Sequence, residues 1–139
     1  MFLVFTGENV KVGVYVDDLL GIGEKDSLLK IKEKLAENMT LKDLGAASRL
    51  LSINVRKING VLTLNQTDYI TSVLNDFGFS DCKPVTSPFA LEFGGNSARD
   101  ELIDSTRYRS AVGSLLYIAN CTRPDIFNAV CKVSRKSNQ

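Results

Sequence analysis

The sequence predicts an α+β protein, with antiparallel hairpins in its first half and helices in its second half. Two observations indicate the sheet. Apolar and other residues alternate over residues 12–16, and an Asn59-Gly60 pair, a strong type I′ turn signal, separates two β-type runs. A third observation indicates the helices: downstream of residue 66, apolar residues recur at intervals of three and four. At 139 residues, the chain is one domain or a pair of small lobes.

Two hairpins are expected first. Residues 2–5 pair with residues 10–16 around a turn at residues 7–9, and residues 10–16 then pair with a run that ends near Gly23. A helix follows, with Asp26 or Ser27 as its N-cap. Its apolar stripe is expected to comprise Leu28, Ile31, Leu35 and Met39. We interpret its lysine- and glutamate-rich remainder as a solvated outer face rather than a nucleic-acid patch.

Residues 48–65 are expected to form the next hairpin, folded about Asn59-Gly60. The predicted apolar face holds Leu51, Ile53, Val55, Leu62 and Leu64. The mostly polar face holds Leu50, Ser52, Asn54, Arg56 and Thr63. A sheet edge of this kind turns its polar side to solvent or to a ligand.

Three helices are expected after the sheet. The first has Asn65 as its N-cap and stops at Gly78. The second spans roughly residues 105–120, and the third begins with Pro124 near its first position. Residues 83–101 contain two of the three prolines and a Gly-Gly pair, so they are predicted to be a loop.

Composition excludes several classes of protein. Hydrophobic residues make up 44% and charged residues 24% of the chain, as in ordinary soluble globular domains. The chain has no histidine, which excludes Ser/His and Cys/His catalysis, and its three cysteines lack metal-ligand spacing, so we expect reduced intracellular thiols. No apolar run approaches the ~20 residues that a membrane helix needs, and the expected location is the cytoplasm or nucleus. The net charge of +1 lacks the basic excess of a free-standing nucleic-acid binder.

Asp17 and Asp18 are the most informative pair of residues. They are expected at the tip of the second hairpin, although Asp-Asp is a poorer turn than Asp-Gly and the two charges repel. Alternation along the strand puts Asp17 on the face of Tyr15 and leaves Asp18 on the opposite face unless the turn swings it round. Carboxylate oxygens are the ligands that Mg²⁺ prefers, although an Asp-Asp hairpin tip is usually just a solvated turn.

A family resemblance extends over nearly the whole chain. Tyr15-Val16-Asp17-Asp18 matches the Tyr-x-Asp-Asp signature of reverse transcriptases, and its flanks resemble the copia-type retrotransposon group. The further matching blocks, in the family's order, are Leu41-Lys42-Asp43-Leu44-Gly45, Leu50-Leu51-Ser52-Ile53, Asp76-Phe77-Gly78-Phe79 with Cys82-Lys83-Pro84-Val85, Tyr108-Arg109-Ser110-Ala111-Val112-Gly113-Ser114-Leu115-Leu116-Tyr117, and Thr122-Arg123-Pro124-Asp125-Ile126.

The resemblance implies a C-terminal palm and thumb piece of a Pol polyprotein. Residues 1–66 correspond to part of an antiparallel palm with the YVDD hairpin and a primer-grip hairpin, and residues 67–139 to a helical, thumb-like segment with a loop at 83–101. The implied activity is RNA-directed DNA polymerisation by two-metal nucleotidyl transfer, with Mg²⁺ or alternatively Mn²⁺. The implied partners are an RNA or DNA template–primer and a deoxynucleoside triphosphate, and no membrane.

The same resemblance assigns roles to individual residues. Asp17 and Asp18 are the implied catalytic metal ligands, and Asp17 is the stronger candidate. Tyr15 would line the floor beneath the nucleotide and template–primer, and Lys42 would lie beside the leaving pyrophosphate. The implied primer grip comprises Leu50, Leu51 and Ser52, where the family usually has phenylalanine at the first of these positions and glycine at the third.

We expect these 139 residues to be inactive by themselves. The family's other metal-bridging aspartate lies upstream of the YVDD hairpin and is not in this sequence, nor is an RNase H region. The alternative is a non-enzymatic remnant or a domesticated module that binds nucleic acid or protein; an in-frame upstream palm would favour the polymerase, and stop codons the remnant. An unpaired palm edge would also favour self-association.

Overall fold

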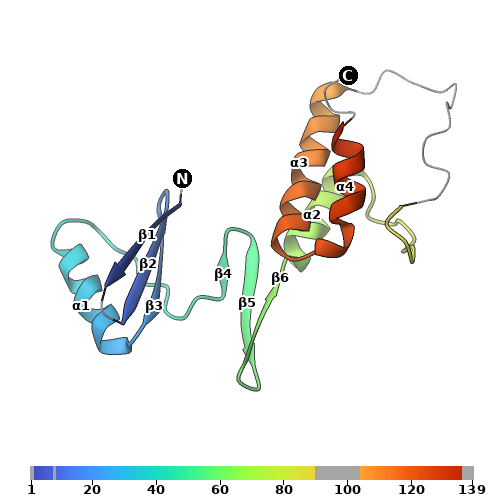
Figure 1. Cartoon of the computed structure of the whole chain (residues 1–139). Coiled ribbons are helices and arrows are strands. Elements are labelled where there is room, and N and C mark those ends of the chain that lie inside the picture. The colour runs from blue at the N-terminus through green and yellow to red at the C-terminus, as the bar shows by residue number, and fades with distance from the viewer. Residues whose placement is uncertain (1, 8, 90–103, 136–139) are drawn as a thin grey trace, which may run out of the picture. The chain divides into compact units, whose positions relative to one another are not determined.

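The computed structural model describes residues 2–7, 9–89 and 104–135, and it confirms the α+β class. This part of the chain contains two three-stranded antiparallel sheets and four α-helices (Figure 1). The elements gather into two compact units, Met1–Ala47 and Ser48–Gln139. The second sheet therefore belongs to the same unit as the C-terminal helices, whereas our expected boundary at residue 66 follows the change from strands to helices.

The first unit is a β-meander with one helix. Strand β1 (Phe2–Gly7) pairs with β2 (Val10–Tyr15), and β2 pairs with β3 (Asp18–Gly23), each in antiparallel register. Helix α1 (Lys25–Ala36) contacts β3 (Figure 1). The first hairpin is longer than expected, because pairing continues to Gly7 and Val10; Glu8, in the expected turn, lies outside the described residues.

Helix α1 begins earlier than expected. Its N-cap is Glu24, without a side-chain cap hydrogen bond, so Asp26 and Ser27 were wrong as N-caps. The chain enters the helix directly from Gly23, which has a φ of 154° and leaves no room for a Cβ beside the Asn9 carbonyl. Asp26 instead lies in the first turn, where its charge is favourable to the helix dipole.

The apolar stripe of α1 is confirmed in part. Leu28, Ile31 and Leu35 are half-buried, which agrees with their spacing on one helical face. Met39 follows the end of the helix and is 49% exposed, so it does not extend the stripe.

The second unit opens with a three-stranded sheet of β4 (Arg49–Leu50), β5 (Ile53–Ile58) and β6 (Val61–Asn65). Asn59 and Gly60 both have positive φ, which confirms the predicted type I′ turn. Val55 lies opposite Leu64, so these two share the expected apolar face.

Three helices and one 3₁₀ turn complete the second unit: α2 (Thr67–Phe77), α3 (Ser105–Cys121), η1 (Pro124–Ile126) and α4 (Phe127–Ser134). Helix α3 packs against both α2 and α4 (Figure 1). The buried apolar residues at these contacts are Val73, Val112, Ile118, Ala119 and Val130. The helix expected to begin near residue 105 is confirmed as α3. Pro124 begins a 3₁₀ turn that leads into α4.

The residues that cap α2 explain where this helix begins and ends. Gly78 is the C-cap in the left-handed conformation, as predicted from its position. At the other end, the N-cap is Gln66 rather than Asn65, although the Asn65 side chain still accepts a hydrogen bond from the Thr67 amide at 3.3 Å. The buried Gln66 side chain accepts a hydrogen bond from the Thr122 hydroxyl at 2.8 Å, which joins the start of α2 to the end of α3.

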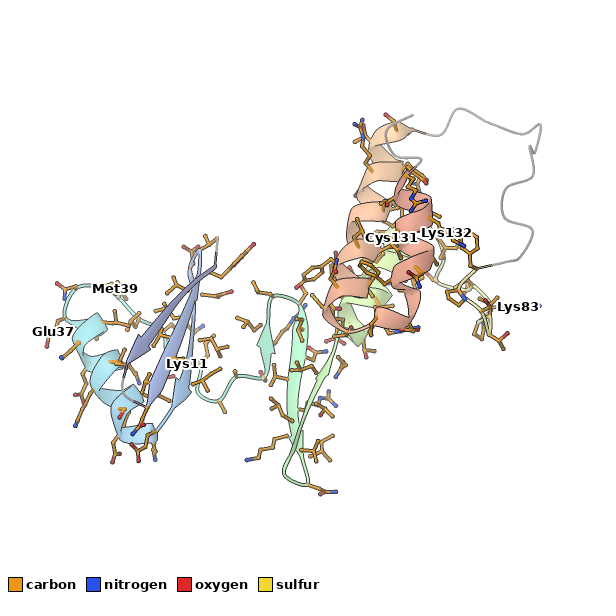
Figure 2. The ribbon with its side chains drawn as sticks, viewed as in Figure 1. Lys11, Glu37, Met39, Lys83, Cys131 and Lys132 are labelled. Carbon is orange, nitrogen blue, oxygen red and sulfur yellow. The ribbon has the colours of Figure 1, made fainter. Side chains whose placement is uncertain are left out.

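The irregular segment after α2 lies against α4 at one point. The Lys132 ammonium is 4.4 Å from the centroid of the Phe89 ring, a cation–π contact, and Figure 2 labels Lys132 on α4. Residues 82–89 have no regular secondary structure, in agreement with the predicted loop, and residues 90–101 of that loop lie outside the described residues.

Candidate active site

The YVDD hairpin has a two-residue turn formed by Val16 and Asp17. Tyr15, the last residue of β2, lies directly opposite Asp18, the first residue of β3. We had expected both Asp17 and Asp18 at the tip, but only Asp17 lies there. The reason is the length of the turn: a two-residue loop places the residues on either side of it opposite each other.

This register places Asp18 on the face of Tyr15, the outcome that we expected only if the turn swung that residue round. Side chains of residues directly opposite in an antiparallel pair lie on the same face of the sheet, with Cβ atoms roughly 4.5–5.5 Å apart. Asp18 is therefore the acid that shares the face of Tyr15, whereas Asp17 lies in the turn itself. Tyr15 is 38% exposed and both carboxylates are exposed, so the three side chains are accessible from solvent.

Val16 occupies an unfavourable backbone conformation at this turn. Its φ is 51°, in the left-handed region that β-branched residues rarely adopt, and its side chain is 74% exposed. Residues held in such conformations cost about 1–3 kcal/mol each and cluster at functional sites. The strain falls between the tyrosine and the two acids of the motif.

The carboxylates of Asp17 and Asp18 are available to a cation. Neither makes a hydrogen bond or an ion pair with another described residue. Two hard carboxylates suit Mg²⁺, which is commonly held by one or two carboxylates together with phosphate oxygens and water. Within residues 2–7, 9–89 and 104–135, no group of three or more acidic or sulfur ligands gathers at one place, so this pair is a partial ligand set.

Lys42 lies in the irregular segment after α1, and its side chain is exposed. The neighbouring Asp43, for which we predicted no role of its own, is the residue that organises this segment. Its carboxylate forms an ion pair with Lys32 of α1 and accepts a hydrogen bond from the Gly45 amide at 2.9 Å. The hydrogen bond from Lys32, followed by that from Gly45, holds the pKa of Asp43 below its usual value.

The three residues of the expected primer grip lie around a second tight turn. Leu50 pairs with Ile53, and the two residues between them, Leu51 and Ser52, have φ values of 49° and 62°. Positive φ at both central positions is characteristic of a type I′ turn, which normally contains Asn or Gly. We had expected Leu51 on the apolar face of β5 and β6, but it lies in the turn instead.

From the sequence, we did not predict the contact that a residue of α3 makes with this turn. The Tyr117 hydroxyl of α3 donates a hydrogen bond to the carbonyl oxygen of Leu51. The available signal was a tyrosine within an apolar helical stripe, because a partly buried tyrosine usually finds a partner for its hydroxyl. The structure thus joins the expected grip to α3 within the second unit.

The charges divide unevenly between the two units. Residues 1–47, which carry the YVDD hairpin, contain six lysines and eight carboxylates. Residues 48–139 contain eleven lysines and arginines and eight carboxylates, so the basic excess lies entirely in the second unit. The low net charge of the chain conceals this division.

The hairpin thus brings a tyrosine and two exposed carboxylates to one tight turn, and comparison with known proteins gives the family. Residues 1–91 match the family described as reverse transcriptase (RNA-dependent DNA polymerase). This chain belongs to the reverse transcriptase family.

Its relatives include retrotransposon polyproteins. The chain is 38% identical over 138 residues to the retrovirus-related Pol polyprotein from transposon TNT 1-94 of Nicotiana tabacum, covering 88% of this chain and 10% of that protein. It is 34% identical over 142 residues to the Pol polyprotein from transposon RE1 of Arabidopsis thaliana, covering 97% and 9%. An uncharacterized mitochondrial protein of Arabidopsis thaliana is 35% identical over 127 residues, covering 91% and 52%.

The chain thus spans about a tenth of each of these polyproteins and about half of the mitochondrial protein. No solved structure matches the chain significantly. None of the helices within the described ranges is both long and apolar enough to cross a membrane.

Proposed function

We propose that this chain supplies part of the polymerase site of a copia-type Pol polyprotein, which copies an RNA or DNA template into DNA. The observation that carries the proposal is the YVDD hairpin: its turn holds Tyr15 opposite Asp18, and both acids are exposed and have no hydrogen-bond or ion-pair partner among the described residues. Two adjacent exposed carboxylates also occur in solvated turns, and the strained valine between them and Tyr15 is what favours the functional interpretation.

Asp17 and Asp18 are the residues that would hold Mg²⁺, or Mn²⁺ in its place. When bound there, the ions would supply activation of the primer 3′-hydroxyl and neutralisation of the triphosphate charge. The register makes Asp18 as strong a ligand candidate as Asp17, because it is Asp18 that shares a face with Tyr15. Further ligands come from substrate phosphates and from parts of the polyprotein beyond this pair.

The remaining site residues bind and orient the substrates. Tyr15 offers an accessible aromatic face at the floor of the site, and Lys42 offers an exposed ammonium to the leaving pyrophosphate. The Leu50–Ser52 turn would lie against the primer strand, and the basic excess of the second unit would bind the phosphates of the template–primer. In addition, β1 and β3 each pair only with β2 among the described strands, so they offer edges for self-association.

The metal proposal is tested with Mn²⁺ as a paramagnetic probe. In the ¹H–¹⁵N spectrum of the chain, Mn²⁺ is expected to broaden the amide signals around Asp17 and Asp18 first, and the double substitution Asp17→Asn/Asp18→Asn is expected to abolish this. Asp104→Asn is the matched control, because Asp104 is an exposed acid that is already engaged as the N-cap of α3. Equal broadening at all exposed acids would contradict the proposal.

The catalytic proposal is tested by exchange into a longer relative. The matching segment of the tobacco polyprotein is replaced with residues 1–139, and incorporation of nucleotides on a primed RNA template is measured. We expect incorporation by the chimera, background activity after Asp17→Asn, and no incorporation by the 139-residue chain alone. Full activity of the Asp17→Asn chimera would refute the role of this acid, and incorporation by the isolated chain would refute the dependence on other segments.

A further inference from the structure

The Leu51–Ser52 turn is held in a conformation that its residues do not favour. Both have positive φ, and neither is a glycine or an asparagine. Left-handed backbone costs an ordinary L-residue because Cβ approaches the following carbonyl oxygen. By contrast, the turn at the other end of β5 has the same type of geometry and is formed by Asn59 and Gly60, which adopt it readily. An additional interaction must therefore hold the Leu51–Ser52 turn.

That interaction comes from a helix distant in the sequence. Tyr117 lies in α3, and its hydroxyl donates a hydrogen bond to the Leu51 carbonyl oxygen, 66 residues earlier in the chain. The phenol ring packs edge-to-face against Tyr69 of α2, with ring centroids 5.4 Å apart and an interplanar angle of 89°. The packing of α3 against α2 thus orients the Tyr117 hydroxyl toward the Leu51 carbonyl oxygen.

We propose that Tyr117 is the positioning residue of the primer grip. Its hydroxyl fixes the Leu51 peptide, which keeps the Leu51–Ser52 turn in the left-handed conformation and presents one backbone surface to the primer strand. The primer's part in this inference rests on the proposed function. The hold on the turn does not, because it follows from the strain and the hydrogen bond alone.

The size of the effect follows from one neutral hydrogen bond. Such a bond shifts an equilibrium by roughly fivefold in favour of the bonded state. In its absence the ratio of other conformations to the held turn is expected to rise about fivefold. Binding of the primer is expected to weaken in proportion to the fraction of held turn that is lost, with about fivefold as the upper bound. The fold of the helices is expected to survive, since Tyr117→Phe keeps the ring and its contact with Tyr69.

The chain contains a matched control for this substitution. Tyr108, also in α3, donates a hydrogen bond from its hydroxyl to the Val133 carbonyl oxygen at 2.7 Å, away from the turn. Tyr117→Phe and Tyr108→Phe each remove one hydroxyl from a bond to a main-chain carbonyl. A merely structural role predicts similar consequences for the two substitutions, whereas a positioning role predicts that only the first affects the turn and the primer.

Two measurements on the 139-residue chain test the inference. The first is hydrogen exchange and the HN–Hα coupling at Leu51 and Ser52, which report the turn without nucleic acid. The second is the affinity for a DNA primer with a recessed 3′ end on an RNA template at low salt. We expect Tyr117→Phe to accelerate exchange at the turn and to weaken primer–template binding by up to about fivefold, while Tyr108→Phe leaves both unchanged.

A rescue variant separates positioning from general stability. Ser52→Gly relieves part of the backbone cost, so in its presence Tyr117→Phe is expected to weaken binding less than twofold. An unchanged turn in Tyr117→Phe, or an equal effect of Tyr108→Phe, would overturn the inference. A chain that holds its turn but binds no primer–template would overturn the proposed function and the primer's part, and the exchange data would still decide the hold on the turn.

Discussion

Replacing Val16 with glycine is expected to stabilise the YVDD hairpin, although it deletes an apolar side chain. Val16 has a φ of 51° and a side chain that is 74% exposed, so it has much backbone strain to release and little packing to lose. Most valine-to-glycine substitutions in strands and turns are destabilising because glycine has the more flexible unfolded chain. The expected sign is therefore unusual, and it depends on the positive φ.

The magnitude is the balance of three effects. Release of a left-handed β-branched residue contributes about 2 kcal/mol. The extra entropy of glycine in the unfolded chain removes about 0.5–1 kcal/mol, and loss of the buried quarter of the side chain removes about 0.5 kcal/mol. The net stabilisation is about 0.5–1 kcal/mol. Val61, 63% exposed and without positive φ, is the control, and Val61→Gly is expected to destabilise the β5–β6 hairpin by about 1–1.5 kcal/mol.

Hydrogen exchange of the strand amides provides the assay. Protection of β2 and β3 is expected to rise roughly threefold in Val16→Gly, and protection of β5 and β6 to fall roughly fivefold to tenfold in Val61→Gly. If both substitutions lower protection in their own hairpins by the same factor, the backbone of Val16 is not strained and the reasoning is refuted.

The remaining predictions concern two glycines and one ion pair. Gly113→Ala in α3 is expected to stabilise the chain by about 0.5–1 kcal/mol. Gly78→Ala at the left-handed cap of α2 is expected to destabilise it by about 1–2 kcal/mol, although a Cβ at either position meets nothing within 4 Å. A thermal unfolding midpoint that moves in the same direction for both would contradict this. Because its lowered folded-state pKa favours the ionised form, Asp43 is expected to order the segment after α1 above about pH 4 and to lose this effect as pH falls through the folded pKa. An NMR titration of the Gly45 amide tests this, and Asp43→Asn should remove the transition; because Asp43 is exposed, salt should weaken the effect.

Local signals predicted the elements well where one residue type has a strong conformational preference. Asn59-Gly60 specified its own turn, and Gly78 specified the end of α2, because these residues adopt positive φ at low cost. The other two tight turns, at Val16-Asp17 and Leu51-Ser52, contain residues that oppose the conformation they adopt. For that reason we misplaced the tip of the YVDD hairpin, favoured Asp17 over Asp18 for the face of Tyr15, and assigned Leu51 to a sheet face.

By itself, the sequence determined the α+β class, most helices and strands, and the motif blocks of the reverse transcriptase family, since periodicity, caps and blocks are properties of neighbouring residues. The tertiary structure alone decided that Asp18 faces the same side as Tyr15 and that Tyr117 reaches the Leu51 carbonyl. The reason is physical: the register of the YVDD hairpin follows from a two-residue turn that its own residues disfavour, and a hydrogen bond across 66 residues is set by the packing of whole elements.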